Sequence, residues 1–215
     1  MSVFVFGGNG FVGSAIIRKL VESGVPCVGV SRRASDIAPW HVADAMDPST
    51  YPDMSGARAV VVSMGTPPLP FVDYETQRAA NGASNVRVLE AAQALGVRTV
   101  LVNATMPRWA PSGYRDGKLD AEKAATGVVL KPSAIYGTRY HNGIPIPLHF
   151  LAPVSWVFRL PIAGKLCELA PGLFEGALVP PVPVSKVAKA AFDACVTDDF
   201  RPAVLGPHDI LSVLP

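Results

Sequence analysis

The chain has few cysteines, and none of them are grouped as metal ligands would be. Cys27, Cys167 and Cys195 are the three cysteines among 215 residues, and they lie far apart in the sequence. Their spacing fits neither a disulfide framework nor the paired ligands of a zinc site. We therefore expect no bound metal and a reducing compartment. An apolar strand pattern begins directly after Ser2, so we also expect no signal peptide or transit segment within this sequence.

The chain also carries little net charge. The formal net charge is +2, and no run of basic residues is longer than a pair such as Arg32 and Arg33. Nucleic-acid-binding proteins usually carry a basic patch or stripe. The composition therefore gives no support to a nucleic-acid partner.

One long segment, residues 140–158, contains no Lys, Arg, Asp or Glu. Hydrophobic residues make up 49% of the chain, and its mean hydropathy is +0.30. The segment is long enough for a membrane span, but Pro145, Pro147 and Pro153 would break the helix. We predict no transmembrane span and expect an apolar surface or pocket, with peripheral membrane contact as an option.

Strand patterns alternate with amphipathic helix patterns through much of the chain. Strands are predicted over residues 3–6, 27–30, 41–43, 59–63, 99–102 and 128–130, and helices over 11–23, 74–95, 114–125 and 185–196. This order is typical of a doubly wound parallel sheet. It predicts an α/β fold with a single Rossmann-type domain over residues 1–215.

Beyond Ser133 the pattern changes to Pro-rich apolar sequence. We expect residues 138–184 to form a small cap over the carboxyl edge of the sheet. Ligands of open α/β sheets bind at that edge.

A glycine-rich loop joins the first predicted strand to the first predicted helix. Gly7, Gly10 and Gly13 recur at intervals of three. Glycines at this spacing allow a tight turn, close approach to a pyrophosphate and packing of the helix on the strand, while the free N–H groups of the helix face the phosphates. The loop therefore predicts a dinucleotide site.

The residues after the second predicted strand bear on the type of dinucleotide. NAD sites place an acidic residue about twenty residues past the loop, whereas this chain has Ser31, Arg32 and Arg33 there. Guanidinium groups suit a 2′-phosphate, which favours NADP(H) over NAD(H), although two solvated surface arginines would look the same. Asp44 could accept a hydrogen bond from an adenine amine or could be an exposed turn residue.

Tyr114 and Lys118 are four residues apart on a predicted helix and so share one face. An ammonium group there would lower the pKa of the phenol, and the tyrosine could then exchange a proton with a carbonyl or alcohol oxygen. Gly117 argues against this helix, because glycine weakens a helix by about 1 kcal/mol relative to alanine. The alternative is a surface tyrosine near an unpaired lysine.

These motifs, in this order, resemble the short-chain dehydrogenase/reductase superfamily, in its extended and atypical branches, over nearly the whole chain. The resemblance assigns the cofactor to two groups of residues. The first group is Gly7, Asn9, Gly10, Phe11, Val12 and Gly13 of the loop with Ser31, Arg32, Arg33 and Asp44; the second is Met64, Gly65, Asn81, Lys118, Pro132 and Ile135.

A mitochondrial and plastid subgroup of that superfamily is the most similar. It includes a short-chain-like protein of coenzyme Q biosynthesis and plastoglobule relatives, and it is also similar to the nucleotide-binding accessory subunit of respiratory complex I. The resemblance implies a link to quinone or prenyl-lipid metabolism and an inner-membrane-associated, mitochondrial location. It also implies either an apolar small-molecule substrate or protein subunits bound through residues 144–178.

The chain departs from this family directly after the fifth predicted strand. Active relatives carry Ser or Thr there to hold the substrate oxygen, whereas this chain has Asn103, Ala104 and Thr105. Thr105 could substitute, Asn103 could donate instead, or the site could be inactive. The chain also lacks the large C-terminal substrate domain of sugar epimerases, so nucleotide-sugar chemistry is not expected.

Two functions stay open at this point. The first is an NADP(H)-dependent oxidoreductase with Tyr114 as acid and base, Lys118 tuning it, and Thr105 or Asn103 orienting the substrate. The second is a non-catalytic nucleotide-binding subunit of a membrane complex. A redox-sensing regulator that binds NADPH fits the same loop.

Overall fold

The computed structural model describes residues 1–106, 109–141, 144–148 and 179–213. Residues 149–178 of the expected cap lie outside the described residues, as does most of the expected partner-binding segment 144–178. None of the described helices combines the length and hydropathy that a membrane crossing requires. The described residues also contain no cluster of three or more His, Cys, Asp or Glu side chains that could hold a metal ion.

The main sheet has seven strands, all parallel, in the order β10-β6-β5-β4-β1-β2-β3. The strands are β1 (Val3–Phe6), β2 (Cys27–Ser31), β3 (Trp40–Val42), β4 (Ala59–Val62), β5 (Thr99–Val102), β6 (Val128–Leu130) and β10 (Ala203–Leu205). The order reverses direction between β1 and β4, which is the point where ligands of doubly wound sheets bind. The structure therefore confirms the predicted Rossmann-type α/β fold.

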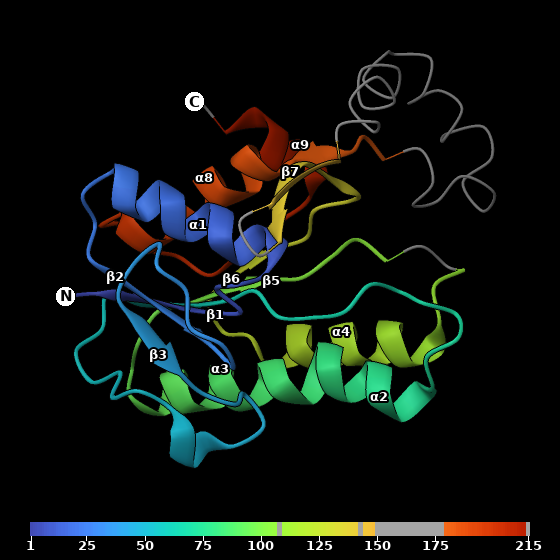
Figure 1. The fold of residues 1–215 in the computed structure, drawn as a ribbon, viewed down its shortest axis with the longest axis horizontal. Coiled ribbons are helices and arrows are strands. Elements are labelled where there is room, and N and C mark those ends of the chain that lie inside the picture. The colour runs from blue at the N-terminus through green and yellow to red at the C-terminus, as the bar shows by residue number, and fades with distance from the viewer. Residues whose placement is uncertain (107–108, 142–143, 149–178, 214–215) are drawn as a thin grey trace.

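Helices cover both faces of the sheet (Figure 1). One face carries α1 (Phe11–Glu22), α8 (Val184–Val196) and α9 (Pro207–Ser212), and the other carries α2 (Tyr74–Arg78), α3 (Ser84–Ala94) and α4 (Ser112–Ala124). The strands between them are rich in valine, and β4 and β5 are buried along their whole length. Strands buried on both faces read as continuous apolar runs, which is why residues 59–63 and 99–102 could be recognised as strands.

The long helix predicted over residues 74–95 is interrupted by a π-helical segment. Residues Ala79–Ala83 form this turn between α2 and α3. Such π-bulges are rare and occur frequently at functional sites. In this chain the π-turn contains Asn81, one of the expected cofactor residues.

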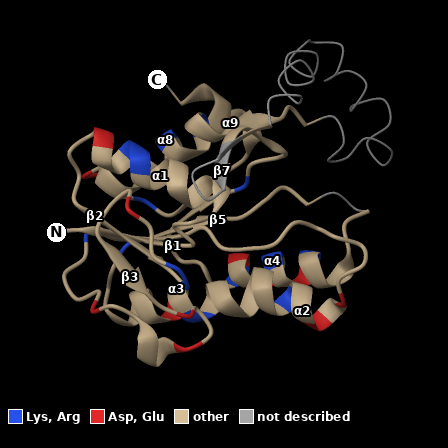
Figure 2. Ribbon diagram, in the orientation of Figure 1, with Lys and Arg blue, Asp and Glu red and all other residues tan. Residues whose placement is uncertain are grey.

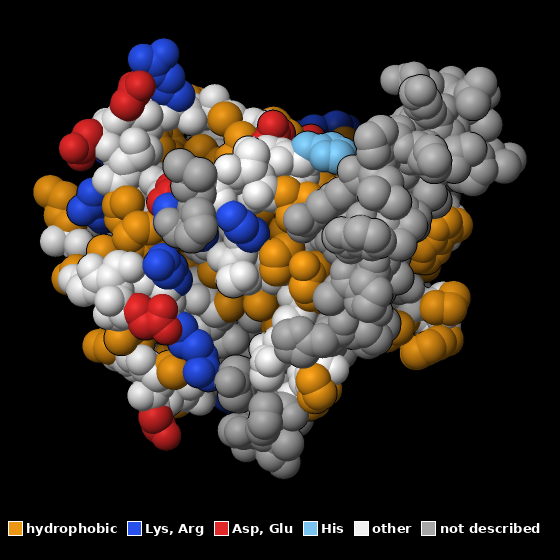
Figure 3. All heavy atoms as spheres, turned by 90° about the horizontal axis from the view of Figure 1, so that it is seen from above, with side chains coloured by type: hydrophobic (Ala, Val, Ile, Leu, Met, Phe, Trp, Pro, Cys, Tyr) orange, Lys and Arg blue, Asp and Glu red, His pale blue; other side chains and the backbone are white. Residues whose placement is uncertain are grey.

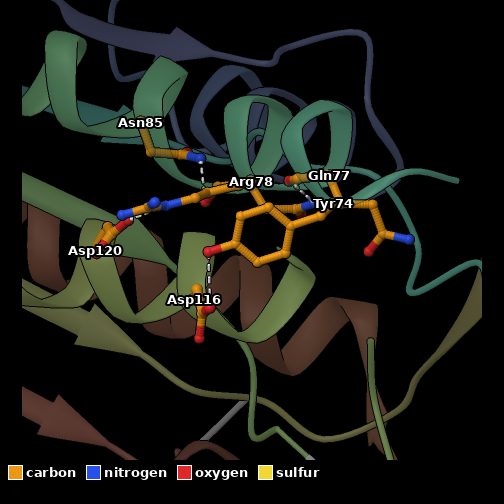
Figure 4. A network of polar contacts seen from close by, with 7 residues as sticks. Tyr74, Gln77, Arg78, Asn85, Asp116 and Asp120 are labelled. Atoms are coloured by element: carbon orange, nitrogen blue, oxygen red, sulfur yellow. Dashed lines mark hydrogen bonds and ion pairs between the residues drawn. The ribbon is translucent and has the colours of Figure 1, made fainter. Parts of the chain in front are cut away.

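Two polar side-chain pairs join α2 to α4 on the outer side of the molecule (Figure 4). The Tyr74 hydroxyl donates to Asp116 over 2.9 Å, and Arg78 pairs with Asp120 at 2.9 Å. These pairs lie partly in solvent, where an ion pair contributes about 0–1 kcal/mol. They fix the orientation of two helices whose buried faces line the sheet.

Five elements after residue 130 were not predicted. Strand β7 (Ile135–His141) pairs with β8 (Ile144–Leu148) and with β9 (Val182–Pro183), forming a separate three-stranded sheet. Strand β8 is an edge strand, where proline is tolerated. Strand β10 and helix α9 complete the main fold near the C-terminus.

Candidate functional site

The glycine loop brings the start of α1 against the end of β1. Gly7 has a φ of +79°, and its N–H donates to the Val30 carbonyl over 2.9 Å. A Cβ atom at Gly13 would lie 2.2 Å from the Gly7 carbonyl oxygen, so only glycine fits there. Gly10 is the N-cap of α1 and supplies no side-chain cap. The first N–H groups of this helix are therefore available to a phosphate.

The loop is tied to the end of β2 by side chains. The Asn9 amide nitrogen donates to Ser31 Oγ over 3.0 Å and also to the Arg33 carbonyl, and Ser31 Oγ donates to the same carbonyl over 2.7 Å. Phe11 and Val12 follow as half-buried residues of the first turn of α1. This network holds the backbone of residues 31–33 beside the predicted phosphate site.

Arg32 and Arg33 are both exposed, and neither guanidinium has a hydrogen-bond or ion-pair partner within the described ranges. Both side chains are therefore free to meet an anion at the end of β2. Asp44 lies just past β3 and is exposed. One of its carboxylate oxygens accepts from the Met46 N–H over 2.9 Å, so Asp44 stabilises a turn.

A second cluster of expected residues meets where β4 ends. A Cβ atom at Gly65 would lie 2.6 Å from Asn81 Oδ1 and 3.1 Å from Lys118 Nζ. The Met64 carbonyl oxygen is 3.5 Å from Lys118 Nζ. The structure thus brings together Met64, Gly65, Asn81 and Lys118, which are up to 54 residues apart in sequence.

Asn81 fixes the chain after Gly65. Its Oδ1 accepts from the Thr66 N–H over 3.1 Å, and its Nδ2 donates to Thr66 Oγ1 over 3.1 Å and to the Gln77 carbonyl over 2.9 Å. The oxygen and the nitrogen of its side-chain amide are thus both hydrogen-bonded within the protein. Asn81 therefore shapes the backbone of the site in this structure.

Lys118 is only 6% exposed and has no ion-pair partner among the residues that the structure describes. Burial lowers the pKa of its ammonium group to about 8, because the charged form is poorly solvated. A buried lysine with one weak contact, at 3.5 Å, is unusual. It retains donor capacity for a ligand at this point.

Tyr114 lies one turn before Lys118 on the same face of α4, and it is 8% exposed. Its hydroxyl has no hydrogen-bond partner in the described part of the chain. Burial raises the pKa of the Tyr114 phenol. The sequence-based expectation of a lowered pKa is therefore wrong, since burial of the phenol shifts its pKa in the opposite direction.

Asn103 and Thr105 follow β5, and their donors point to protein carbonyls. Asn103 Nδ2 donates to the Lys118 carbonyl over 3.1 Å and to Glu122 over 3.3 Å. The Thr105 hydroxyl donates to the Lys131 carbonyl over 2.9 Å, which leaves its oxygen free to accept. Neither side chain is held ready to donate to a substrate.

Pro132 and Ile135 lie at the opposite side of the carboxyl edge from β2. The Pro132 carbonyl accepts from the Thr105 N–H over 2.8 Å, and Ile135 begins β7 and packs against the core. Ser133, between them, donates to the Pro180 carbonyl over 2.6 Å. These contacts connect the main sheet to the small sheet.

One residue near the site, Trp40, was missed by sequence reasoning. Its ring covers Gly8 and Gly29, since Cβ atoms built at those glycines would lie 2.8 Å and 2.2 Å from it. A glycine inside a strand, as at Gly29, can signal such close approach. Ser63 ends the predicted strand 59–63, and its Oγ donates to the Phe6 carbonyl over 3.0 Å beside Gly13.

The charges of the molecule lie mainly on the outer surfaces of the helices and on loops (Figure 2). The carboxyl edge of β1 and β4 is instead lined by glycine, apolar residues and the buried Lys118. Such an edge suits a dinucleotide, whose flat apolar rings can lie along it while its phosphates meet the start of α1.

Comparisons with known proteins agree with this geometry. Residues 3–143 match the NAD dependent epimerase/dehydratase family. An uncharacterized chloroplastic protein of Arabidopsis thaliana is 34% identical over 220 residues, which cover 92% of this chain and 72% of that protein. The match spans the glycine loop, the Asn81 segment and the Tyr114–Lys118 helix.

Solved structures share the fold at low identity. MoeE5 in complex with UDP-glucuronic acid and NAD has a TM-score of 0.66 and 20% identity, covering 96% of this chain and 76% of that one. ADP-L-glycero-D-manno-heptose-6-epimerase of Helicobacter pylori has a TM-score of 0.66 and 14% identity, covering 95% and 76%. A short-chain dehydrogenase/reductase superfamily protein from Agrobacterium tumefaciens with bound NAD has a TM-score of 0.64 and 20% identity, covering 96% and 77%.

The family supports the expected relationship to the extended short-chain dehydrogenases and a nicotinamide dinucleotide as cofactor. The glycine cradle at Gly7 and Gly13 and the unpaired Lys118 fit such a group. With sequence match, fold and site in agreement, this chain belongs to the NAD dependent epimerase/dehydratase family.

Proposed function

We propose that this protein is an NADP(H)-dependent oxidoreductase that acts on an apolar carbonyl or alcohol, such as a quinone or a prenylated precursor. The observation that carries the proposal is the pair of buried residues on α4: an ammonium group without a counter-ion at Lys118 and a phenol without a hydrogen-bond partner at Tyr114. Both groups lie on one face of a helix beside the cofactor loop.

The cofactor would be held along the carboxyl edge of the sheet. The N–H groups at the start of α1 would bind the pyrophosphate, Arg32 and Arg33 the 2′-phosphate, and Lys118 the nicotinamide ribose. When bound, the nicotinamide supplies or accepts the hydride. The preference for NADP(H) rests on the two unpaired guanidinium groups at the end of β2.

Tyr114 would move the proton in this reaction. In the reducing direction, its hydroxyl donates a proton to the substrate oxygen, and the nearby Lys118 ammonium stabilises the phenolate that forms. Because the Thr105 hydroxyl already donates to the Lys131 carbonyl, its oxygen would serve as an acceptor for an alcohol and not as a donor. Burial around Tyr114 excludes water from the proton transfer.

A quinone or prenyl-lipid substrate is favoured by the apolar character of the chain near the site. Residues 64–72, after β4, carry no charged side chain. The resemblance to the coenzyme Q subgroup points the same way and suggests a mitochondrial inner-membrane location. The Arabidopsis relative is named as chloroplastic, so a plastid location is the competing proposal.

Nucleotide binding and turnover test this function separately. We expect purified protein to bind NADPH at least tenfold more tightly than NADH, and a double variant, Arg32→Ser with Arg33→Ser, to lose that difference. Arg201→Ser, an exposed arginine paired with Asp199, is the matched control. Equal affinities for NADH and NADPH in the unmodified protein would overturn the NADP(H) assignment.

Turnover is measured as NADPH oxidation with a short-chain quinone. Tyr114→Phe should lower this rate at least a hundredfold, since general acid catalysis contributes about 10²–10⁴-fold, and should leave NADPH affinity within a factor of about three. An equally fast Tyr114→Phe variant would contradict the proposed acid.

The second candidate is a non-catalytic nucleotide-binding subunit of a membrane complex such as respiratory complex I. It is favoured by Asn103, whose amide donates to Lys118 and Glu122 where active relatives would place a substrate-orienting hydroxyl. This candidate predicts nucleotide that co-purifies with the protein, no NADPH oxidation with quinones, and indifference to Tyr114→Phe.

A further inference from the structure

Two aromatic side chains protrude from the end of the molecule where the candidate site opens. Phe71 is 81% exposed and Trp109 is 74% exposed. Phe71 lies between β4 and α2, and Trp109 lies between β5 and α4. These two loops leave the carboxyl edge of neighbouring central strands, so both aromatic residues flank the predicted site.

The two loops lie side by side. A Cβ atom at Gly113, at the start of α4, would lie 2.3 Å from the Tyr74 carbonyl oxygen, at the start of α2. Phe71 is three residues before Tyr74, and Trp109 is four residues before Gly113. Figure 1 shows that the described parts of both loops lie at the same end of the molecule, beside the starts of α2 and α4, and Figure 3 shows apolar side chains protruding at this end.

Hydrogen bonds within the loop hold Phe71 in its exposed position. The Val72 N–H donates to the Leu69 carbonyl over 3.3 Å, which closes a turn with Pro70 and Phe71 at its tip. The fully buried Gln77, seen in Figure 4, donates from its amide to the carbonyls of Leu69 and Val72. Both sides of the turn are thus anchored to α2, and Phe71 is held outward.

We propose that Phe71 and Trp109 form a lipid-docking rim that inserts into the interface of a membrane. Phenylalanine and tryptophan at protruding loop tips are the residue types that partition into that interface. This inference deepens the proposed function, because an apolar substrate such as a quinone would then reach the site directly from lipid.

The size of the rim argues against a protein partner. A phenylalanine and a tryptophan bury about 150–250 Å² each, whereas a stable protein interface needs about 800 Å² per partner. Two protruding rings therefore supply about half of that area. Insertion into lipid needs no matching surface, and the strength of membrane binding scales with the apolar area inserted.

Charge near the rim indicates the type of lipid. Residues 64–72 carry no charge and are followed by the exposed Asp73 and Glu75, whereas Arg108 directly precedes Trp109 in the sequence. The charged residues that neighbour the rim in the sequence are therefore of both signs and do not form the basic cluster that attracts anionic lipids. We therefore expect the two rings to carry the docking, so that neutral bilayers are bound.

Vesicle flotation with phosphatidylcholine tests the rim. We expect the unmodified protein to float with the vesicles, and a double variant, Phe71→Ser with Trp109→Ser, to lower the bound fraction at least fivefold, with each single variant between. Val42→Ser with Val204→Ser removes two apolar side chains that are each 58% exposed elsewhere and should leave the bound fraction unchanged. Quenching of tryptophan fluorescence by brominated phosphatidylcholine should fall in Trp109→Phe.

The lipid-docking proposal would be wrong if the unmodified protein did not bind vesicles, or if the Phe71→Ser, Trp109→Ser variant bound them equally well. It would also be wrong if this variant lost self-association, because a second copy of the chain would then be the occupant of the rim. Slower turnover of a water-soluble quinone with unchanged vesicle binding would make these residues substrate contacts instead. NADPH affinity of every variant reports on the cofactor site, so failure of the proposed function is distinguishable from failure of the rim.

Discussion

Asn103 donates from its side-chain amide to the main-chain carbonyl of Lys118, across 3.1 Å between β5 and α4. The same nitrogen donates to Glu122 over 3.3 Å, and Glu122 pairs with Lys131 at 2.9 Å. The end of β5 thus holds the helix turn that carries Lys118. Asn103 thereby positions Lys118, which gives this departure from the family a structural role.

Asn103→Ala should therefore weaken nucleotide binding as well as stability. Loss of the two buried hydrogen bonds should lower the free energy of unfolding by about 1–2 kcal/mol, and movement of Lys118 should raise the dissociation constant for NADPH several-fold. Denaturant unfolding and NADPH titration measure the two effects.

Asn85→Ala is the matched control. Asn85 is also fully buried and donates once, to the Asn81 carbonyl over 2.9 Å, and it does not contact α4 through a hydrogen bond. We expect a similar loss of stability with a smaller change in NADPH affinity. The same affinity loss in both variants would mean that Asn103 has no special relation to Lys118.

Lys118→Met should stabilise the nucleotide-free protein. Burial lowers the pKa of Lys118 from 10.5 to about 8. At pH 7 the folded state therefore carries a poorly solvated charge that costs roughly 3 kcal/mol, because each pKa unit corresponds to about 1.36 kcal/mol. Removing the charge should raise the free energy of unfolding by about 2–3 kcal/mol at pH 7 and abolish NADPH binding.

The sign of the pH dependence gives a second test of Lys118. Between about pH 8 and 10.5, the unfolded state binds a proton that the folded state has released, so this group makes the folded protein more stable as pH rises. The advantage of Lys118→Met should shrink over that window and stay constant below it. Unfolding of both proteins from pH 7 to 10.5 measures this, and a constant difference would show that Lys118 is not buried in the charged form.

Gly117 shows how helix propensity and packing can oppose each other. Propensity alone predicts that Gly117→Ala stabilises α4 by about 1 kcal/mol. In the structure, a Cβ atom there would lie 2.9 Å from the Arg78 carbonyl oxygen and 3.0 Å from the Gly82 nitrogen. These are backbone atoms that cannot rotate away, and overpacking costs about 1–3 kcal/mol.

We therefore expect Gly117→Ala to lower the free energy of unfolding by about 1 kcal/mol or more and to disturb the neighbouring Lys118. Leu119→Ala changes a residue of the same helix that is 42% exposed and should have little effect. Thermal unfolding of the two variants measures these changes in stability. A more stable Gly117→Ala variant would show that α4 can move away from the segment of Arg78 and Gly82 at little cost in free energy.

The features that sequence could predict were local ones. The loop Gly7 to Gly13, the buried valine strands and the Tyr114–Lys118 spacing are each contained in a few consecutive residues, and periodicity or glycine spacing reveals them. Gly117 was interpreted as evidence against the helix, although the close crossing at Gly82 explains it. A contact with a residue 35 positions away leaves no signal in the local pattern.

What sequence could not predict depends on pairing at a distance. Strand β9 has two residues and β10 has three, and each is defined by a neighbour, Ile135 for Val182 and Val128 for Ala203. Such short segments carry too few residues for a period of two to be visible. The direction of the pKa shift at Tyr114 was also missed, because burial is a property of the folded molecule.

The cofactor cradle depends on the close approach of α1 to β1 at Gly13. A Cβ atom at Gly13 would lie 2.2 Å from the Gly7 carbonyl oxygen and 2.8 Å from Ser63 Oγ. Gly13→Ala would push α1 away from β1 and enlarge the turn that approaches the pyrophosphate. We expect NADPH affinity to fall at least a hundredfold, measured by titration, with a loss of stability of about 1–3 kcal/mol.

Gly24→Ala separates the two effects. Gly24 follows α1 with a φ of +68°, and a Cβ atom there would have nothing within 4 Å. Alanine at that φ costs about 1 kcal/mol through backbone strain alone, so this variant should lose stability and keep NADPH affinity. If Gly13→Ala bound NADPH as tightly as Gly24→Ala, the helix start would not be the phosphate site, and the cofactor would have to be held by other residues.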